Sequence, residues 1–87
     1  MKWQEIREQY PGRWLLAEAL DAYTTQDNRR IVGQWAVIDS FSSFYEAMRR
    51  YKKIHRQAPA RELYVVHTDN PEVKITEQRW VGIRGNA

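Results

Sequence analysis

The sequence predicts a small α+β domain, in which a long helix covers one face of a mixed β-sheet. Two stretches rich in β-branched and aromatic residues, 31–38 and 63–66, indicate strands, and apolar residues between them recur at helical spacing. The chain has 87 residues, of which 43% are hydrophobic, so residues 1–87 have room for one domain with a thin core. The expected element order is α-β-β-α-β-β.

A short helix is expected first. Trp3, Ile6 and Tyr10 recur at the spacing of one helical face. Pro11 disfavours helical geometry at the residue before it, and Gly12 supplies a turn. The helix is therefore expected to end at Tyr10.

A β-hairpin is expected next. Residues 14–24 are mostly apolar with isolated acids, and the polar residues 24–28 are typical of a turn. The stretch 30–38 then predicts a second strand, antiparallel to the first. Gly33 within it indicates a bulge or the close approach of another backbone.

A long helix follows, capped by Ser42 or Ser40 and running through Gln57. Its expected core-facing stripe consists of Phe41, Phe44, Tyr45, Met48, Tyr51 and His55. The opposite face carries Arg49, Arg50, Lys53 and Arg56. Strands are expected at 62–68 and 73–76, and 79–83 is expected to be extended. A right-handed crossover through the long helix predicts that the second and third strands are parallel, and the order of the strands in the sheet stays open.

The basic face of this helix is a candidate nucleic-acid surface. Residues 44–87 carry nine Lys or Arg against five Asp or Glu, whereas residues 1–43 carry five against six. Arg49, Arg50, Lys53 and Arg56 could follow a phosphate backbone. The charge pattern alone favours a solvated helix face of no special function over nucleic-acid binding.

Catalytic and metal-binding patterns are weak. The absence of cysteine excludes disulfides and thiol catalysis. His55, His67 and Asp69 could hold a divalent metal, but their spacing matches no metal motif and favours structural roles. Glu18 and Asp21 have opposite parity in a strand, so they do not predict a catalytic pair. We expect a non-enzymatic protein without cofactor or metal.

The chain is expected to be cytoplasmic and not to bind a membrane. No apolar run approaches the 18 residues of a membrane-spanning helix, and the first residues lack the pattern of a signal peptide.

A protein-interaction surface is the favoured function. A thin core has limited room for four Trp and five Tyr, so some aromatic residues are expected on the surface. The expected contact residues are Trp80, Val81, Ile83 and Arg84. An open sheet edge would also accept a strand from a partner protein or from a second copy of the chain.

Three segments together resemble a known family: Trp3-x-Glu5-Ile6 with Tyr10-Pro11-x-x-Trp14, the stretch 55–68 (HRxAPxRELYVxHT), and Trp80-x-Gly82-Ile83-Arg84-Gly85. The family consists of small, functionally uncharacterised bacterial cytoplasmic proteins. Their genes often neighbour one for a retropepsin-like aspartic protease, in an arrangement like a toxin–antitoxin pair. The resemblance implies an antitoxin-like accessory protein with a protein partner, and it assigns no catalytic residues.

Overall fold

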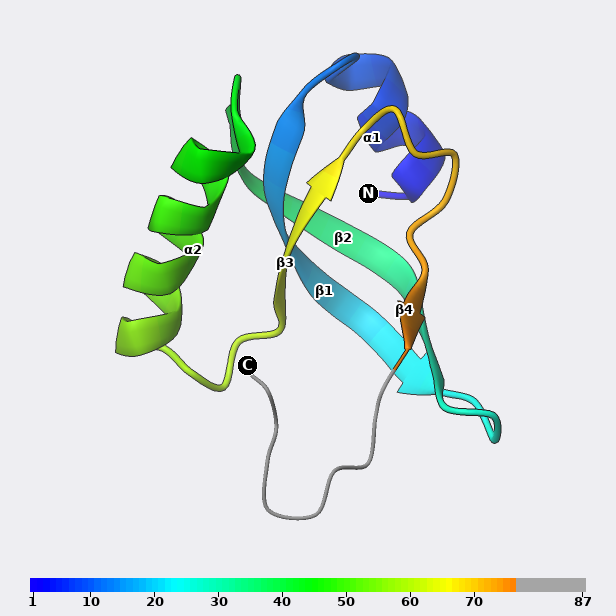
Figure 1. The fold of residues 1–87 in the computed structure, drawn as a ribbon. Helices are drawn as coiled ribbons and strands as arrows, with labels where there is room; N and C mark the ends of the chain where they lie inside the picture. The colour runs from blue at the N-terminus through cyan, green and yellow to red at the C-terminus, as the bar shows by residue number, and fades with distance from the viewer. Residues whose placement is uncertain (77–87) are drawn as a thin grey trace.

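Among residues 1–76, which are the residues that the structure describes, four antiparallel strands form a sheet between two helices (Figure 1). The structure is a computed structural model. In chain order its elements are α1 (Trp3–Gln9), β1 (Trp14–Thr24), β2 (Arg29–Phe41), α2 (Phe44–Gln57), β3 (Leu63–His67) and β4 (Ile75–Thr76). This order confirms the predicted α+β class. The stretch 79–83, which was expected to be extended, lies outside the described residues.

The strand order is β3-β1-β2-β4, and all neighbours are antiparallel, whereas the sequence predicted a mixed sheet. β2 and β3 run in the same direction, as expected, but β1 lies between them. The outer edge of β2 is already occupied: the Trp35 N–H donates to the Met1 carbonyl at 2.8 Å, and β4 pairs with Arg29 and Arg30. β3 instead pairs with the first half of β1, Trp14–Glu18.

The larger core lies on the face of the sheet that α1 covers. Its buried residues come from α1, β1 and β2 and are Ile6, Leu15, Ala17 and Trp35. Trp3 and Tyr10 pack against this cluster, as the predicted helix face requires. The ring of Trp35 lies 6.2 Å from that of Trp3 and meets the ring of Tyr64 edge-on at 5.8 Å. α1 ends before Gly12, whose φ of 65° gives the expected turn.

The opposite face of the sheet lies under α2. Side chains alternate between the two faces along a strand, so Leu16 points away from the Leu15 and Ala17 cluster. Leu16 is fully buried, and α2 packs against β1 and β3 on this side (Figure 1). The ring of Trp14 meets that of Phe44 edge-on at 5.0 Å. The sheet is therefore covered on both faces, by α2 as predicted and by α1 in addition.

The predicted orientation of α2 is wrong by part of a turn. Ala47 is the fully buried residue of the helix, while Phe44 and Tyr45 of the expected core stripe are 50% and 69% exposed. His55 is exposed as well, and its ring stacks on that of Tyr51. The small side chain of Ala47 faces the sheet, whereas the larger rings of Phe44 and Tyr45, which both precede it, are turned partly toward solvent. The N-cap is Ser43 rather than Ser42 or Ser40, and the end at Gln57 is as expected.

A buried threonine joins the end of β3 to the turn before β1. The Thr68 hydroxyl donates to the Tyr10 carbonyl at 2.7 Å and accepts from the Arg13 N–H at 2.9 Å. Arg7 adds a hydrogen bond from its Nε to the Thr68 carbonyl at 3.0 Å. These contacts fix the position of β3 relative to α1.

The hairpin of β1 and β2 contains the irregularity that Gly33 predicted. Ala19 pairs with Trp35 and Ala22 with Val32 in one register, but Asp21 between them pairs with Gln34, so the register shifts on both sides of Asp21. A Cβ atom on Gly33 would lie 3.3 Å from a carboxylate oxygen of Asp21, a tight contact. A glycine therefore fits this bulge, where the twist of the hairpin increases. The expected turn follows β1, with Asn28 at a φ of 65°.

The two leucines of β1 provide a matched test of this packing. Leu16 is fully buried, whereas Leu20 is 60% exposed. We expect Leu16→Ala to lower the free energy of unfolding by about 2–5 kcal/mol because it leaves a cavity under α2. Leu20→Ala is expected to change it by less than about 0.5 kcal/mol. Urea unfolding measures both values, and equal losses would contradict the assignment of the two faces.

Candidate functional site

The residues considered for metal binding are not brought together. Within residues 1–76, no group of three or more His, Cys, Asp or Glu side chains is arranged to hold a metal ion. His55 stacks on Tyr51, at 5.4 Å between the ring centres. His67 Nδ1 accepts a hydrogen bond from the Asp69 N–H at 3.0 Å, and its ring packs edge-on against Trp14. His55 thus lies on the exposed side of α2 and not in the core as expected, while His67 contacts its own turn and Trp14.

Glu18 and Asp21 do not form a pair of carboxylates. Glu18 accepts hydrogen bonds from Arg61, with 2.7 Å between Nη2 and Oε1. These bonds hold the pKa of Glu18 below its ordinary value and raise that of Arg61. Asp21 is exposed and lies beside Gly33. Glu18 thus anchors the segment that leads into β3.

An ion pair that the sequence did not predict joins the start of β2 to the start of β3. Arg30 makes two parallel hydrogen bonds to the Glu62 carboxylate, at 2.9 and 2.8 Å, and Tyr64 donates its hydroxyl hydrogen to the same carboxylate at 2.7 Å. The hydrogen bonds from Arg30 are the largest cause that holds the pKa of Glu62 below its ordinary value, and the bond from Tyr64 acts in the same direction. Partial burial of the carboxylate acts against them. No sequence pattern marks this pair, because its members are 32 residues apart.

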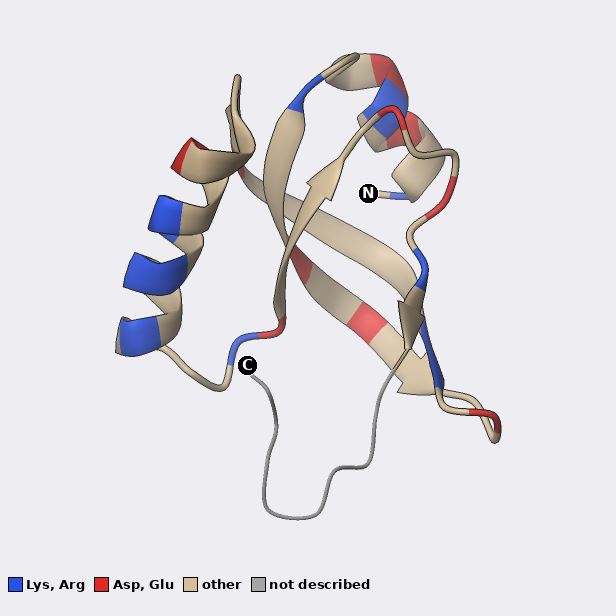
Figure 2. Cartoon of the chain, viewed as in Figure 1, with Lys and Arg blue, Asp and Glu red and all other residues tan. Residues whose placement is uncertain are grey.

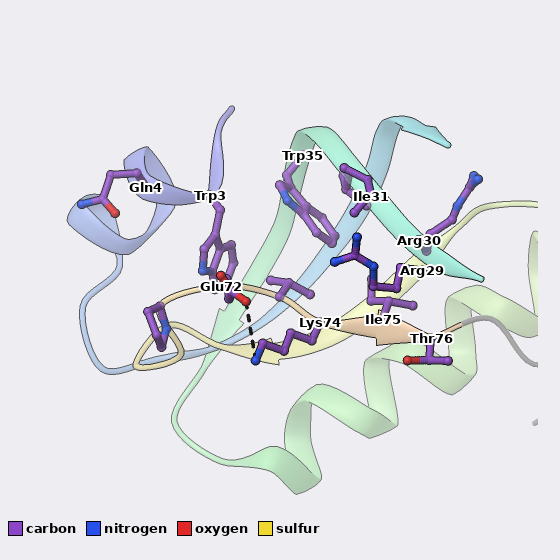
Figure 3. A pocket seen from close by; sticks show the side chains of 13 residues that line it. Trp3, Gln4, Arg29, Arg30, Ile31, Trp35, Glu72, Lys74, Ile75 and Thr76 are labelled. Atoms are coloured by element: carbon purple, nitrogen blue, oxygen red, sulfur yellow. Dashed lines mark ion pairs between the residues drawn. The ribbon is translucent and has the colours of Figure 1, made fainter. Parts of the chain in front are cut away.

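A pocket of about 650 Å³ lies between α1, β2 and the segment around β4. Figure 3 shows the rings of Trp3 and Trp35 on one side of it and Ile75 on the other. Each cation in its lining has a carboxylate partner: Arg29 pairs with Asp27, Arg30 with Glu62 and Lys74 with Glu72. Each of these cations already lies beside a carboxylate of the chain, and we assign no ligand to this pocket.

The basic face of α2 is exposed, and Figure 2 shows its cations along the outer side of the helix. Its members are Arg49, Arg50, Lys53 and Arg56, as predicted, together with Lys52. Arg50 lies 3.5 Å from the Asp39 carboxylate, a loose surface ion pair. The guanidinium carbon of Arg49 lies 5.8 Å from the ring centre of Tyr45. We call these five cations the α2 basic face.

β3 forms an edge of the sheet, and its backbone alternates between the two sides. The Glu62 carbonyl accepts from the Ala19 N–H at 2.9 Å, and the Thr68 N–H donates to the Arg13 carbonyl at 3.0 Å. Even-numbered residues therefore turn their backbone groups toward β1. The residues whose N–H and C=O groups point outward are Leu63, Val65 and His67.

The outer edge of β3 is open as far as residues 1–76 are concerned. No described strand pairs with it, and among its outward groups only the His67 carbonyl has a described partner, the Asn70 N–H at 3.2 Å. In Figure 1, β3 crosses in front of β1 and β2, with α2 on one side and α1 on the other. The strand also lacks the Lys and Pro residues that commonly protect edges.

The expected contact residues Trp80, Val81, Ile83 and Arg84 lie outside the described residues. No helix within residues 1–76 is long and apolar enough to cross a membrane. No family model, curated protein or solved structure matches the chain. Function is therefore inferred from the α2 basic face and the edge of β3.

The contact of Glu62 predicts how stability depends on pH. The pKa of Glu62 in the folded protein lies below its ordinary value of 4.5. The contact therefore stabilises the fold fully above about pH 4.5, and this stabilisation is lost as the pH falls through the folded pKa. We expect the free energy of unfolding of the native protein to decrease more steeply below pH 4.5 than that of Glu62→Gln, whose amide does not titrate. Urea unfolding at a series of pH values tests this. Parallel pH dependences would contradict it.

Proposed function

We propose that the protein is a non-catalytic interaction module that binds an extended polypeptide segment along the outer edge of β3. One observation carries this proposal: a strand-forming sequence without Lys, Arg, Asp or Glu, LYVVH, turns the backbone groups of Leu63, Val65 and His67 away from the sheet. A segment added at such an edge gains main-chain hydrogen bonds, and the side chains beside it provide selectivity.

The surroundings of β3 support this function. Tyr64, Val65, Val66 and His67 are only half-buried, so both faces of the strand offer apolar or aromatic surface next to the edge. The antitoxin-like role that the family resemblance implies would use this edge to hold a partner protein. Three points stay predictions from the sequence: a cytoplasmic location, independence of cofactors, and partner contacts from Trp80, Val81, Ile83 and Arg84.

Val65 is the position at which to test strand addition. Val65→Pro removes an outward N–H and leaves the bonds to β1 in place. With short extended peptides rich in Val, Ile and Thr as probes, we expect NMR shifts at the amides of Leu63, Val65 and His67 in the native protein and no peptide binding by Val65→Pro. Val65→Thr, which keeps the N–H, is the matched control and should bind. Peptides that leave these amides unshifted would overturn the proposal.

The α2 basic face favours a second function, the binding of single-stranded nucleic acid. Five cations face outward on α2, against one acidic residue, Glu46, on the same helix. The rings of Tyr45 and Phe44, 69% and 50% exposed, lie at the start of this helix and could stack on bases. A cationic surface beside exposed aromatic rings suits a phosphate backbone with unpaired bases.

Charge reversal tests this second function. We expect the native protein to bind mixed single-stranded RNA or DNA at low salt, with the logarithm of affinity falling by about 0.7 per phosphate contact for each tenfold rise in salt. Changing Arg49, Arg50, Lys53 and Arg56 to Glu should abolish binding. Reversing two exposed cations elsewhere, Arg29 and Lys74, is the control and should have a small effect. Fluorescence anisotropy gives the affinities, and an absence of binding at low salt would exclude this function.

A further inference from the structure

We propose that the segment added to β3 is the β3 strand of a second copy of this chain, antiparallel and with Val65 on the two-fold axis. This inference rests on the proposed function, because it names the occupant of the same edge. Two independent features of the described residues carry it, the direction of the backbone groups and the charges at the two ends of the strand.

The backbone groups allow this register. In an antiparallel pair, residues that exchange hydrogen bonds must both point their N–H and C=O groups toward the partner. With Val65 on the axis, Val65 lies opposite its own copy and Leu63 lies opposite His67 of the other copy. All three turn their backbone groups outward, and the His67 carbonyl, which accepts from the Asn70 N–H, has a second lone pair for the Leu63 N–H of the other copy, so the two edges can exchange hydrogen bonds in pairs. Tyr64 then lies opposite Val66, an aromatic and β-branched pair of the kind that stabilises sheets.

The charges that flank β3 select this register among the alternatives. Arg61 precedes the strand and Asp69 follows it, and both are exposed. Placing Val65 on the axis brings the end of the strand next to Arg61 in each copy beside the turn that carries Asp69 in the other. Moving the axis by one or more residues in either direction separates these two regions. The sequence of the edge is thus complementary to itself in one antiparallel register.

Both charged groups are able to make the new contact. The bonds of Arg61 to Glu18 use Nε and Nη2, so Nη1 can donate to a second carboxylate. The Asp69 side chain is 78% exposed, and its described contact with His67, at 3.7 Å, is an ion pair only when the histidine is protonated. Each interface would therefore gain two ion pairs without breaking the contacts within either chain.

The test is a charge exchange between two variants. Asp69→Arg places two arginines beside each other at both ends of the interface. The second variant combines Glu18→Arg with Arg61→Glu, which keeps an ion pair within the chain but sets a carboxylate beside Asp69 of the other copy. Glu8→Arg, on the exposed side of α1, makes the same charge change as Asp69→Arg away from the edge and is the control. Circular dichroism verifies that each variant is folded.

Sedimentation equilibrium measures the outcome. We expect the native protein and Glu8→Arg to dimerise, each interface variant alone to dimerise about tenfold or more weakly, and an equimolar mixture of the two to recover native affinity as a heterodimer. A dimer that both variants leave unchanged would overturn the register. A native protein that stays monomeric at all concentrations would overturn the second copy as occupant. Peptide binding at Leu63, Val65 and His67 would then still support the proposed function, whereas its absence would remove that as well.

Discussion

The first half of β1 is enclosed on four sides, and the other elements take their positions from it. Its edges pair with β2 and β3, Leu15 and Ala17 face α1, and Leu16 faces α2. A strand in this position has to be apolar on both faces, since a polar side chain would be buried without hydrogen-bond partners. The uninterrupted run WLLA meets this requirement, and the strand becomes amphipathic or exposed only after Glu18.

Polar contacts at both ends of β3 determine what its outer edge can do. Thr68 fixes one end to the turn before β1, and Glu62 fixes the other end to Arg30. A strand held in this way is already extended and ordered before anything binds to it. When a segment binds, only the segment loses conformational entropy, because the edge is already ordered. This smaller entropy cost favours association.

The sequence predicted what local patterns encode. The hairpin, its turn, the bulge at Gly33 and the end of α2 followed from alternation and from residues with special backbone preferences. The orientation of α2 could not be predicted, because it depends on which side chain of the helix faces the sheet, here the small one of Ala47. The neighbour of β3 could not be predicted either, since an LYVV segment is compatible with any open edge. The α2 basic face was predicted because charge spacing on a helix is local, whereas the pairing of Arg30 with Glu62 is not.

The position of β3 beside β1 has a consequence for the order of folding. The hairpin of β1 and β2 closes through a short turn, but the contacts that place β3 span 43 residues between Glu18 and Arg61 and 55 between Arg13 and Thr68. Closing such long loops is slower than forming a hairpin or a helix. Until β3 arrives, the backbone groups on this edge of β1 are unpaired and lie beside the apolar side chains of Leu15 and Leu16. The interval before loop closure is therefore when the nascent chain is most exposed to aggregation.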